Sequence, residues 1–261
     1  TRLTLRPEHE ELIDAVTAAN RRTVVVVIGG SAVVMEHWRQ RVAAIVLAWY
    51  PGMEGGHALA DVLTGAVEPG GRLPFVMPAS AYHLPPFDPD ATSITYDRWW
   101  GQRRLERDGH EPAYPLGFGL GYTSFEIDTV EVNEVDVERL TGRARVTVRN
   151  TGDRPGATVV QCHGRRDRAD DRADDRADDG AGDRVGDGAS PETVVRRLLG
   201  FARVEAQPSE TVEIDVAVDL RPLARRCSDT GVWAIRSGSH LVEAGRYWGD
   251  PAAATVLLDV D

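Results

Sequence analysis

Residues Ala48–Pro78 read AWYPGMEGGHALADVLTGAVEPGGRLPFVMP and contain the signals of a strand end, a glycine-rich loop and a helix. Ala44–Tyr50 (AIVLAWY), which leads into this stretch, is apolar at every position and predicts a strand covered on both faces. Leu59 and Leu63 follow at helical spacing, and Gly65 stands where a left-handed residue often ends a helix. The stretch therefore predicts a strand–loop–helix unit of an α/β fold.

The residues before this stretch predict a helix and a second strand. Pro7–Asn20 has acidic residues near its start and apolar residues at helical spacing, which predicts an amphipathic helix. Thr23–Ile28 is β-branched throughout, which is typical of a strand buried in a parallel sheet. The short spacing between this strand and Ala44–Tyr50 predicts a right-handed β-α-β unit. The predicted apolar stripe of the helix consists of Leu12, Ile13, Val16 and Ala19.

The second half of the chain changes to the alternating pattern of short strands. From about Ile127, short alternating runs are separated by turn residues, which predicts a β-sandwich of about seven strands. Between the two halves, Tyr82–Asp97 is rich in Pro and Asp and is predicted to be a long loop. The strand candidates are Thr129–Val137, Arg143–Arg149, Thr158–His163, Thr211–Val218 and Gly231–Ile235.

The composition fits a folded protein of two domains and excludes several functions. The chain has 261 residues, of which 42% are hydrophobic, and this is enough for two ordinary cores. A net charge of −11 and scattered arginines argue against nucleic-acid binding. No run reaches the roughly 18 apolar residues of a membrane helix, so no membrane partner is expected. No signal peptide is visible in a sequence that starts at Thr1, and the localisation stays open.

The two cysteines, Cys162 and Cys227, are too few for a disulfide framework. No Cys/His spacing suggests zinc. Both cysteines are predicted to be small apolar residues of the β domain, and a single bridge between them is the alternative.

An acidic segment interrupts the predicted β domain. Arg165–Gly188 contains a DRAD repeat and almost nothing apolar, so residues 165–190 are predicted to be a disordered acidic insertion. Aspartate clusters with glycine can bind calcium. The repeat lacks the ligand spacing of an EF-hand, which favours a solvated insertion over a calcium site.

Three further segments, in a fixed order, have the residues of a known family. Tyr114–Glu126 reads YPLGFGLGYTSFE, Val146–Val160 reads VTVRNTGDRPGATVV and Leu199–Thr211 reads LGFARVEAQPSET. Together with Ala48–Pro78, these segments resemble the C-terminal part of glycoside hydrolase family 3, the β-glucosidase and β-xylosidase family. The resemblance covers almost the whole chain except residues 165–190.

This resemblance implies two domains and a reaction. Residues 1–125 would form the family's C-terminal α/β sandwich domain with a mostly parallel sheet, and residues 126–261 its fibronectin type III-like β-sandwich. The full enzyme would hydrolyse terminal, non-reducing β-linked sugars, glucose or xylose, in an oligosaccharide or glycoside. The resemblance implies no cofactor and no metal. It leaves open the N-acetylglucosaminidase and phosphorylase activities of the same family.

The resemblance also implies that both catalytic groups lie outside this sequence. A retaining glycosidase needs two carboxyl groups about 5–5.5 Å apart, one as nucleophile and one as acid/base. In the family the nucleophile is an Asp of a preceding barrel, and nothing here is typical of that barrel, which takes about 250 residues. The acid/base Glu usually precedes a segment that resembles Arg2–Glu8, so it is expected shortly before Thr1. The chain alone is therefore expected to be inactive.

An aromatic stretch within the irregular region is the candidate for sugar contact. Aromatic faces pack on the apolar faces of pyranose rings, and a nearby carboxylate accepts hydrogen bonds from hydroxyl groups. The alternative is that the same aromatics fill a domain interface. Where the family commonly has G-Y-R, this chain has Gly101-Gln102-Arg103, so one aromatic is lost. The predicted substrate-binding residues are Tyr96, Asp97, Trp99 and Trp100.

Glu54, in the loop PGMEGG, is another acidic candidate. It stands at the end of a predicted strand, where α/β sheets often place ligands. The family has a Glu here that is not the acid/base. Glu54 is therefore predicted to cap the following helix, with its side chain accepting from exposed backbone N–H groups.

A stand-alone binding or scaffold module is the rival hypothesis. In that case the two domains would hold carbohydrate or a protein partner without a barrel. An α/β domain that lacks its barrel would expose apolar surface, whereas a module that evolved to stand alone would not. Exposed apolar surface therefore separates the two hypotheses.

Overall fold

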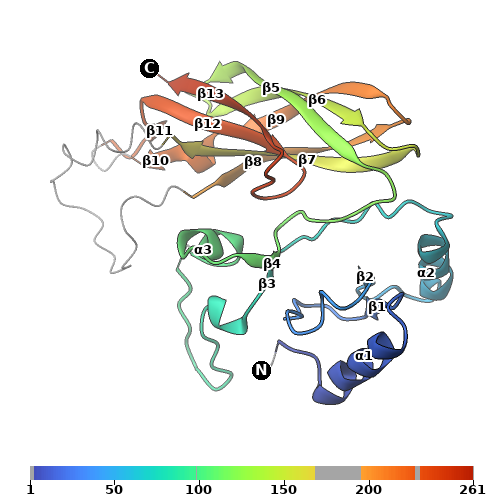
Figure 1. Cartoon of the computed structure of the whole chain (residues 1–261). Coiled ribbons are helices and arrows are strands. Elements are labelled where there is room, and N and C mark those ends of the chain that lie inside the picture. The colour runs from blue at the N-terminus through green and yellow to red at the C-terminus, as the bar shows by residue number, and fades with distance from the viewer. Residues whose placement is uncertain (1–2, 98, 168–194, 227–229, 261) are drawn as a thin grey trace. The chain divides into compact units, whose positions relative to one another are not determined.

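The structure is a computed structural model that describes residues 3–97, 99–167, 195–226 and 230–260 (Figure 1). The chain divides into two compact units. Unit 1 comprises Thr1–Pro69 and Leu73–Leu116, and unit 2 comprises Gly70–Arg72 and Gly117–Asp261. Cys227, the calcium candidate and residues 168–190 of the predicted insertion lie outside the described residues.

Unit 1 contains the predicted helices at its start and after the glycine-rich loop, but no helix lies between its two parallel strands, so the predicted β-α-β unit is wrong. Strands β1 (Val24–Val27) and β2 (Ala44–Leu47) pair in parallel, with Val24 opposite Ala44. The predicted loop at 82–97 contains no strand or helix after the end of the 3₁₀ helix η1 (Ala81–His83). Two short strands, β3 (Met77–Pro78) and β4 (Pro112–Tyr114), pair antiparallel. The remaining elements are the helices α1 (Pro7–Ala19), α2 (Gly55–Thr64) and α3 (Gln102–Arg107).

Helix α2 ends as the sequence predicts. Gly65 has φ 76°, the left-handed region that favours glycine, and its N–H donates to the carbonyl of Val62. The start of α2 differs from the prediction. Glu54 stands at the N-cap position, but its side chain makes no capping hydrogen bond. Its carboxylate lies 2.8 Å from Nδ1 of His57 instead, so the predicted cap is wrong.

Helix α1 has the predicted bounds but a narrower buried stripe. Ile13 and Thr17 are its buried residues. Leu12 is 61% exposed and Val16 is 42% exposed, so the prediction that both face the core is wrong. The two buried residues are four positions apart and therefore lie on one narrow face of the helix. The apolar residues beside this face are not covered by other parts of the unit.

The two parallel strands are only half-buried, not covered on both faces as predicted. Each begins with an exposed residue and continues with half-buried ones. Val25 and Ile45, for example, pack against a small core. The buried residues of this core are Ile13, Met35, Trp38, Met77 and Ala113.

Unit 2 is the predicted β-sandwich. One sheet has the strand order β5-β6-β9 and the other the order β13-β12-β7-β8, and β10 and β11 form a separate pair. The strands are β5 (Phe125–Asp136), β6 (Thr141–Asn150), β7 (Gly156–Arg166), β8 (Arg197–Ala206), β9 (Thr211–Asp219), β10 (Ala224–Arg226), β11 (Trp233–Ile235), β12 (Gly238–Gly245) and β13 (Ala254–Val260); the 3₁₀ helix η2 spans Arg221–Leu223.

Four of these strands were not predicted, and one boundary was placed too early. β8, β10, β12 and β13 were not among the strand candidates. In β12 the buried positions include His240, Ala244 and Gly245, which weaken the alternation. Arg165 and Arg166, predicted to belong to the insertion, complete strand β7. They pair with Leu241 and His240 of β12, so the neighbouring strand orders them.

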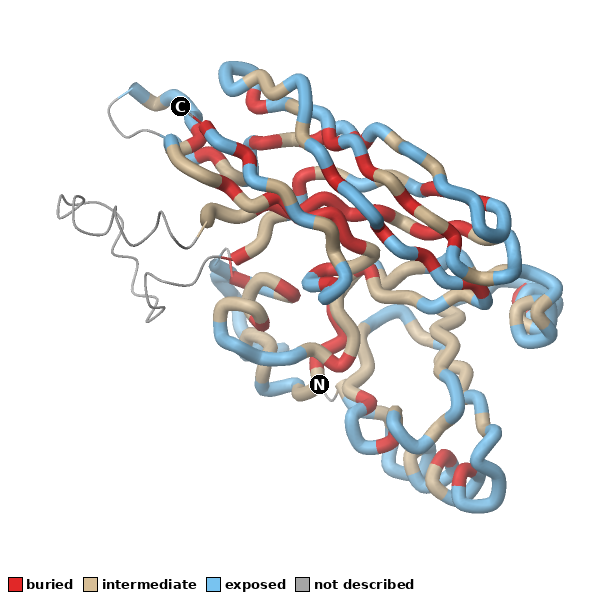
Figure 2. The backbone as a smooth tube through the Cα atoms, turned by 45° about the horizontal axis from the view of Figure 1, so that its top comes forward, coloured by how far each residue is buried: buried red, intermediate tan, exposed pale blue. Residues whose placement is uncertain are grey.

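The core of unit 2 lies between its two sheets. In Figure 2, buried and exposed positions alternate along much of the strands of this unit. Val146 and Val148 of β6 are fully buried, and so are Val160 and Cys162 of β7. Burial raises the pKa of the Cys162 thiol to about 12, so this cysteine behaves as the small apolar residue that was predicted.

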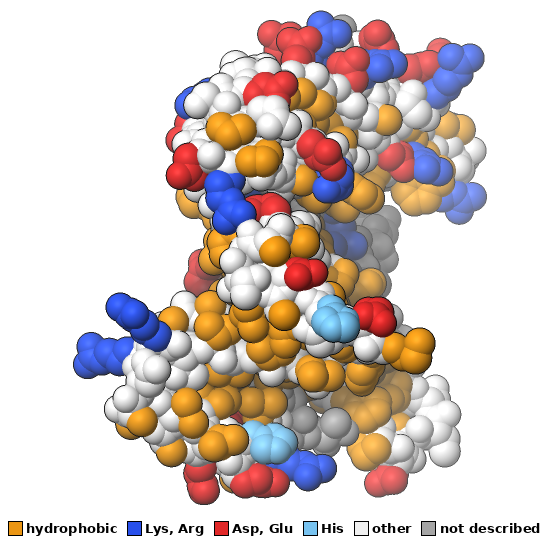
Figure 3. All heavy atoms as spheres, turned by 90° about the vertical axis from the view of Figure 1, so that its right-hand side faces the viewer, with side chains coloured by type: hydrophobic (Ala, Val, Ile, Leu, Met, Phe, Trp, Pro, Cys, Tyr) orange, Lys and Arg blue, Asp and Glu red, His pale blue; other side chains and the backbone are white. Residues whose placement is uncertain are grey.

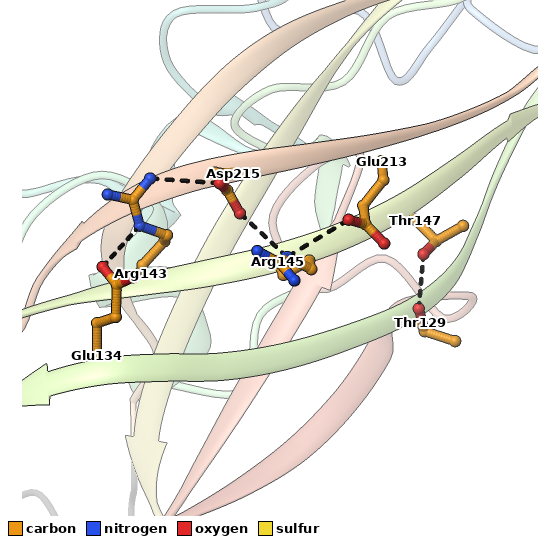
Figure 4. A network of polar contacts seen from close by, with 7 residues as sticks. All are labelled: Thr129, Glu134, Arg143, Arg145, Thr147, Glu213 and Asp215. Atoms are coloured by element: carbon orange, nitrogen blue, oxygen red, sulfur yellow. Dashed lines mark hydrogen bonds and ion pairs between the residues drawn. The ribbon is translucent and has the colours of Figure 1, made fainter.

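The outer face of the sheet β5-β6-β9 carries a charge-compensated ladder (Figure 4). Arg143 contacts Glu134 at 2.9 Å and Asp215 at 3.3 Å. Arg145 contacts Asp215 at 3.3 Å and Glu213 at 3.5 Å. Arg143 meets carboxylates on both neighbouring strands and Arg145 meets two on β9, so this face has the character of a solvent-facing surface.

Asn150, the asparagine of the VRNTG segment, is fully buried and joins distant parts of unit 2. Its Oδ1 accepts from the hydroxyl of Thr123 at 2.6 Å and from the N–H of Gly152 at 3.0 Å. Its Nδ2 donates to the carbonyls of Arg154 at 2.8 Å and Ala206 at 3.1 Å. One side chain therefore connects the three family-like segments of the sequence.

Two glycines of these segments are required by close approach. A Cβ on Gly152 would lie 2.2 Å from the hydroxyl of Thr123. A Cβ on Gly200 would lie 2.2 Å from the carbonyl oxygen of Ala217, which belongs to strand β9 of the other sheet. Gly200 thus lets the two sheets approach at a position where any side chain would separate them.

We expect acid to destabilise unit 2 through His163. This residue is 2% exposed and packs edge-on against Trp248, with ring centroids 4.8 Å apart. Burial, helped by the charge of Arg196, lowers the pKa of His163 from 6.5 to about 3. Between these values the unfolded state binds a proton that the folded state does not, so the free energy of unfolding falls as pH decreases, by up to about 1.4 kcal/mol per unit.

The measurement is amide hydrogen exchange of strands β6 and β7 at pH 7 and pH 5, which reports on unit 2 alone. The His163→Gln variant should lose much of the pH dependence. His57→Gln, an exposed histidine of unit 1, should keep it. An unchanged slope in His163→Gln would contradict the expectation.

Candidate functional site

Asp97 orders the loop that carries the predicted sugar contacts. One of its carboxylate oxygens accepts the backbone N–H of Trp99 at 2.7 Å, which is the geometry of an Asx turn. The carboxylate itself belongs to an exposed residue. Asp97 therefore has a structural contact within the loop.

Trp99 is held by cations of helix α3. It is 7% exposed, and the guanidinium carbons of Arg103 and Arg107 lie 5.5 Å and 5.2 Å from its ring centroid. Arg107 also donates to Asp108 at 2.6 Å, and this contact holds the pKa of Asp108 below its usual range. A ring buried between two guanidinium groups is not free to stack on a sugar.

The side chains of Tyr96 and Trp100 are exposed to solvent. Tyr96 is 56% exposed and Trp100 is 65% exposed. The structure therefore divides the four predicted residues into a supporting pair, Asp97 and Trp99, and an exposed aromatic pair.

Residues 101–103, where the family commonly has G-Y-R, lead into helix α3. Gly101 has φ 58° and begins helix α3, so the chain reverses at a residue that needs a positive φ. Gln102 is buried, and its Oε1 accepts the N–H of Leu116 at 3.0 Å. Here an amide satisfies a backbone donor where the family commonly has an aromatic side chain.

Glu54 has the surroundings of a surface residue. Its side chain is 82% exposed, and that of its partner His57 is 88% exposed. A catalytic acid of a glycosidase usually stands in a pocket that disfavours its charged form. The exposed pair gives Glu54 no such pocket among the described residues, and its non-catalytic role stays a prediction.

Sequence reasoning missed one polar feature of unit 1. The rings of His83 and His110 are stacked, with centroids 3.9 Å apart and an interplanar angle of 8°. The two residues are far apart in sequence, and no spacing motif connects them. No group of three or more His, Cys, Asp or Glu side chains suited to a metal occurs among the described residues. Within the same residues, no helix has the length and apolar character needed to cross a membrane.

Comparison with known families agrees with the two units. Residues 1–122 match the glycosyl hydrolase family 3 C-terminal domain. Residues 185–247 match the fibronectin type III-like domain. The chain belongs to glycoside hydrolase family 3. The α/β elements of unit 1 and the β-sandwich of unit 2 are the structures expected of these two domains.

Relatives of this family 3 chain carry β-glucosidase names. β-Glucosidase B of Emericella nidulans is 34% identical over 254 residues, which are 91% of this chain and 27% of the relative. A probable β-glucosidase J of Aspergillus fumigatus is 32% identical over 98% of this chain and 29% of its own length. The chain thus spans less than a third of the length of these curated relatives.

Solved structures agree with the sequence relatives. DesR, a β-glucosidase from Streptomyces venezuelae solved with D-glucose, matches 99% of this chain and 31% of its own, with TM-score 0.79 and 28% identity. β-Glucosidase 3B from Thermotoga neapolitana matches 99% of this chain and 34% of its own, with TM-score 0.78 and 28% identity. The fold of this family 3 chain is therefore that of the matched third of these enzymes.

Proposed function

We propose that this chain is the C-terminal portion of a retaining β-glycosidase that hydrolyses terminal, non-reducing β-linked glucose or xylose. The observation that carries the proposal is the match of nearly the whole chain to proteins named β-glucosidases, in sequence and in fold. A domain boundary near residue 125 goes with this proposal, and the division of the chain at Leu116–Gly117 supports it.

The catalytic carboxylates are proposed to come from protein outside this chain. The reaction needs a nucleophile and an acid/base on two sides of the glycosidic bond. The acidic candidate within the chain, Glu54, is an exposed residue paired with His57. The relatives are more than three times longer than the matched region, which leaves room for a barrel that supplies the nucleophile.

The test is to determine the coding sequence upstream of Thr1 and to assay both forms. A Glu within the few preceding codons, and a barrel with its Asp before that, should accompany hydrolysis of an aryl β-glucoside by the longer protein and none by this chain. Hydrolysis by the chain alone, abolished by Glu54→Gln, would overturn the proposal. A start codon directly at this position would favour the stand-alone binding module.

Within this function, Trp100 is proposed as the sugar-stacking residue and Tyr96 as its neighbour. The exposure of both rings supports this assignment. Asp97 and Trp99 then act as positioning residues, because they shape the loop through their own contacts.

We expect Trp100→Ala to raise the KM of the longer enzyme for an aryl β-glucoside about 10-fold, since an aromatic contact of this kind contributes about 1–1.5 kcal/mol. Trp233→Ala is the matched control, because Trp233 is 55% exposed in unit 2 and lies outside the proposed site. Asp97→Asn, which keeps the acceptor oxygen, should change KM less than Asp97→Ala. Equal KM values for Trp100→Ala and the control would remove Trp100 from the site.

A further inference from the structure

The rings of His83 and His110 join the two ends of the loop that carries the exposed aromatic pair. They lie nearly parallel, with centroids 3.9 Å apart and an interplanar angle of 8°. We call this contact the histidine stack. Residues 84–97 and 99–109 lie between the two histidines in the sequence, and this stretch includes both Tyr96 and Trp100. A contact between the ends of a loop lowers the number of conformations open to the residues between them.

The first end of the loop is fixed by the turn that follows strand β3. The hydroxyl of Ser80 accepts the backbone N–H of Tyr82 at 3.3 Å and so caps the 3₁₀ helix η1. The N–H of His83, the last residue of η1, donates to the carbonyl of Ser80 at 3.2 Å. The backbone of His83 is therefore held close to the end of β3, and the residue is half-buried.

The second end of the loop is the C-terminus of helix α3. Gly109 has φ 68°, and its N–H donates to the carbonyl of Glu106 at 3.3 Å. The N–H of His110 donates to the carbonyl of Leu105 at 2.8 Å. These two bonds form a Schellman motif, in which His110 follows the left-handed glycine. His110 is therefore fixed to one end of α3, and Trp100 comes just before the other end, about 9 Å away along the helix.

The antiparallel pair β3–β4 brings the two histidines together (Figure 1). Pro78, the last residue of β3, pairs with Pro112, the first residue of β4. His83 follows β3 and His110 precedes β4. The histidine stack therefore forms at the base of the loop, where the chain leaves the strand pair and returns to it.

The face of the ring is the part of His83 that makes a contact. Its Nδ1 atom is buried and makes no hydrogen bond within the part of the chain that the structure describes. A buried polar atom without a partner costs free energy, so the ring occupies this place for the contact of its face with His110. A phenylalanine ring could make the same kind of contact.

Exposure alone does not identify a sugar contact in unit 1. Figure 3 shows hydrophobic side chains over much of the visible face of this unit. A ring that binds sugar must also be held in one orientation, because ordering a loose loop on binding costs affinity. The turn at Asp97 orders the backbone directly before Trp100. The histidine stack fixes the far end of the helix that follows Trp100.

We propose that His83 and His110 are positioning residues of the sugar site. Their stacked rings hold helix α3 at the end of β3 and thereby keep Trp100 and Tyr96 in the orientation that receives a sugar ring. This inference rests on the proposed function. The stack acts through the loop and not on the reacting atoms, so its loss should raise KM and leave kcat unchanged.

The first test uses this chain alone and needs no activity. The amides of Trp99 and Leu105 donate to Asp97 and to the carbonyl of Gly101, so their exchange with solvent reports on the order of the loop and of α3. His83→Ala should accelerate exchange at both amides about fivefold, the size of one aromatic contact, although both are distant from His83 in sequence. The amides of strand β1 show whether the variant folds.

Two controls accompany this variant. His83→Phe keeps a flat ring and should restore slow exchange, whereas a role that depends on the imidazole nitrogens would not be rescued. His57→Ala removes an exposed histidine of helix α2 and should change nothing at Trp99. If His83→Ala does not fold, His110→Ala is measured in its place with the same expectation. Unchanged exchange at Trp99 in a folded variant would overturn the inference and leave the proposed function standing.

The second test measures the longer enzyme with an aryl β-glucoside. His83→Ala should raise KM about fivefold with an unchanged kcat, and His83→Phe should restore KM. When His83→Ala is combined with Trp100→Ala, the rise in KM should stay well below the product of the two single effects, because the stack acts through Trp100. A full product would overturn the inference, and so would an unchanged KM in His83→Ala where Trp100→Ala raises it.

The two tests separate this inference from the proposed function. A longer protein that hydrolyses no glucoside would count against the function alone. Faster exchange in His83→Ala would then still support the histidine stack as the contact that holds the loop, and unchanged exchange would overturn it.

Discussion

Replacing Asn150 with alanine is expected to lower the free energy of unfolding of unit 2 by about 3–4 kcal/mol. The substitution removes four hydrogen bonds from a side chain that is fully buried. It takes the contact with Asn150 away from the hydroxyl of Thr123, the N–H of Gly152 and the carbonyls of Arg154 and Ala206. A buried polar group left without a partner costs about 1–3 kcal/mol, and local relaxation recovers part of the sum.

Denaturant unfolding, followed by hydrogen exchange in strands β6 and β8, measures this loss in unit 2 alone. Asn133→Ala is the matched control, because Asn133 is an exposed asparagine on the neighbouring strand β5. Asn150→Asp should be at least as damaging as Asn150→Ala, since a carboxylate cannot donate to the two carbonyls. A loss below 1 kcal/mol in Asn150→Ala would show that the four bonds are not a structural requirement.

Replacing Asp250 with alanine is expected to cost unit 2 about 3–5 kcal/mol, the range for breaking a buried ion pair. The carboxylate of Asp250 is 1% exposed and binds Arg246 through two nitrogens, at 2.7 Å and 2.9 Å. It also accepts the backbone N–H groups of Arg246 and Ala252. Arg246 in turn donates to the carbonyl of Phe125 at 3.2 Å. The variant would leave a guanidinium in a half-buried site and release the turn between β12 and β13.

Acid titration provides a second measurement of this pair. Burial alone would raise the pKa of Asp250, but the hydrogen bonds with Arg246 and Ala252 outweigh it and hold the pKa below the ordinary value. A lowered pKa means that the stabilisation is fully present above the unfolded value of about 3.9 and is lost as pH falls below it. Asp250→Asn should therefore be less sensitive than the parent between pH 4 and pH 2.

Asp219→Ala is the control for the ion pair. Asp219 binds Arg221 with similar geometry at 2.6 Å, but the side chain of Arg221 is 74% exposed. Solvent screens such a pair, so its loss should be much smaller than that of Asp250. Equal losses in the two variants would mean that burial does not set the strength of the Arg246–Asp250 contact.

Short sequence patterns predict much of the local structure of this chain. The left-handed Gly65 ends α2 as the pattern predicts, and β5, β6, β7 and β9 occur where alternating residues indicate strands. These predictions succeed because turn residues and strand alternation act over a few neighbouring residues. Strand β12 was not predicted, because its buried residues are small or polar and do not form an alternating apolar pattern. These residues are buried because β12 lies between β13 and β7 in the sheet.

The candidate site was predicted as a region but not as an arrangement. The sequence places Tyr96, Asp97, Trp99 and Trp100 in one loop, and the four residue types are all suited to sugar contact. Only the structure shows that the ring of Trp99 is buried against the guanidinium group of Arg107 and that the ring of Trp100 is exposed. Two adjacent tryptophans are equivalent in a sequence, whereas the direction of the backbone decides which ring meets helix α3.

The sequence by itself determined the family, the two kinds of fold and the motif residues, because these depend on residue identity and local spacing. The tertiary structure decided what each motif residue does. Asn150 becomes a junction through partners that lie 27 and 56 positions away. Val24 looks like a core residue in an apolar run, yet it is 40% exposed. Burial and polar satisfaction are properties of elements brought together from distant positions, and no local pattern contains them.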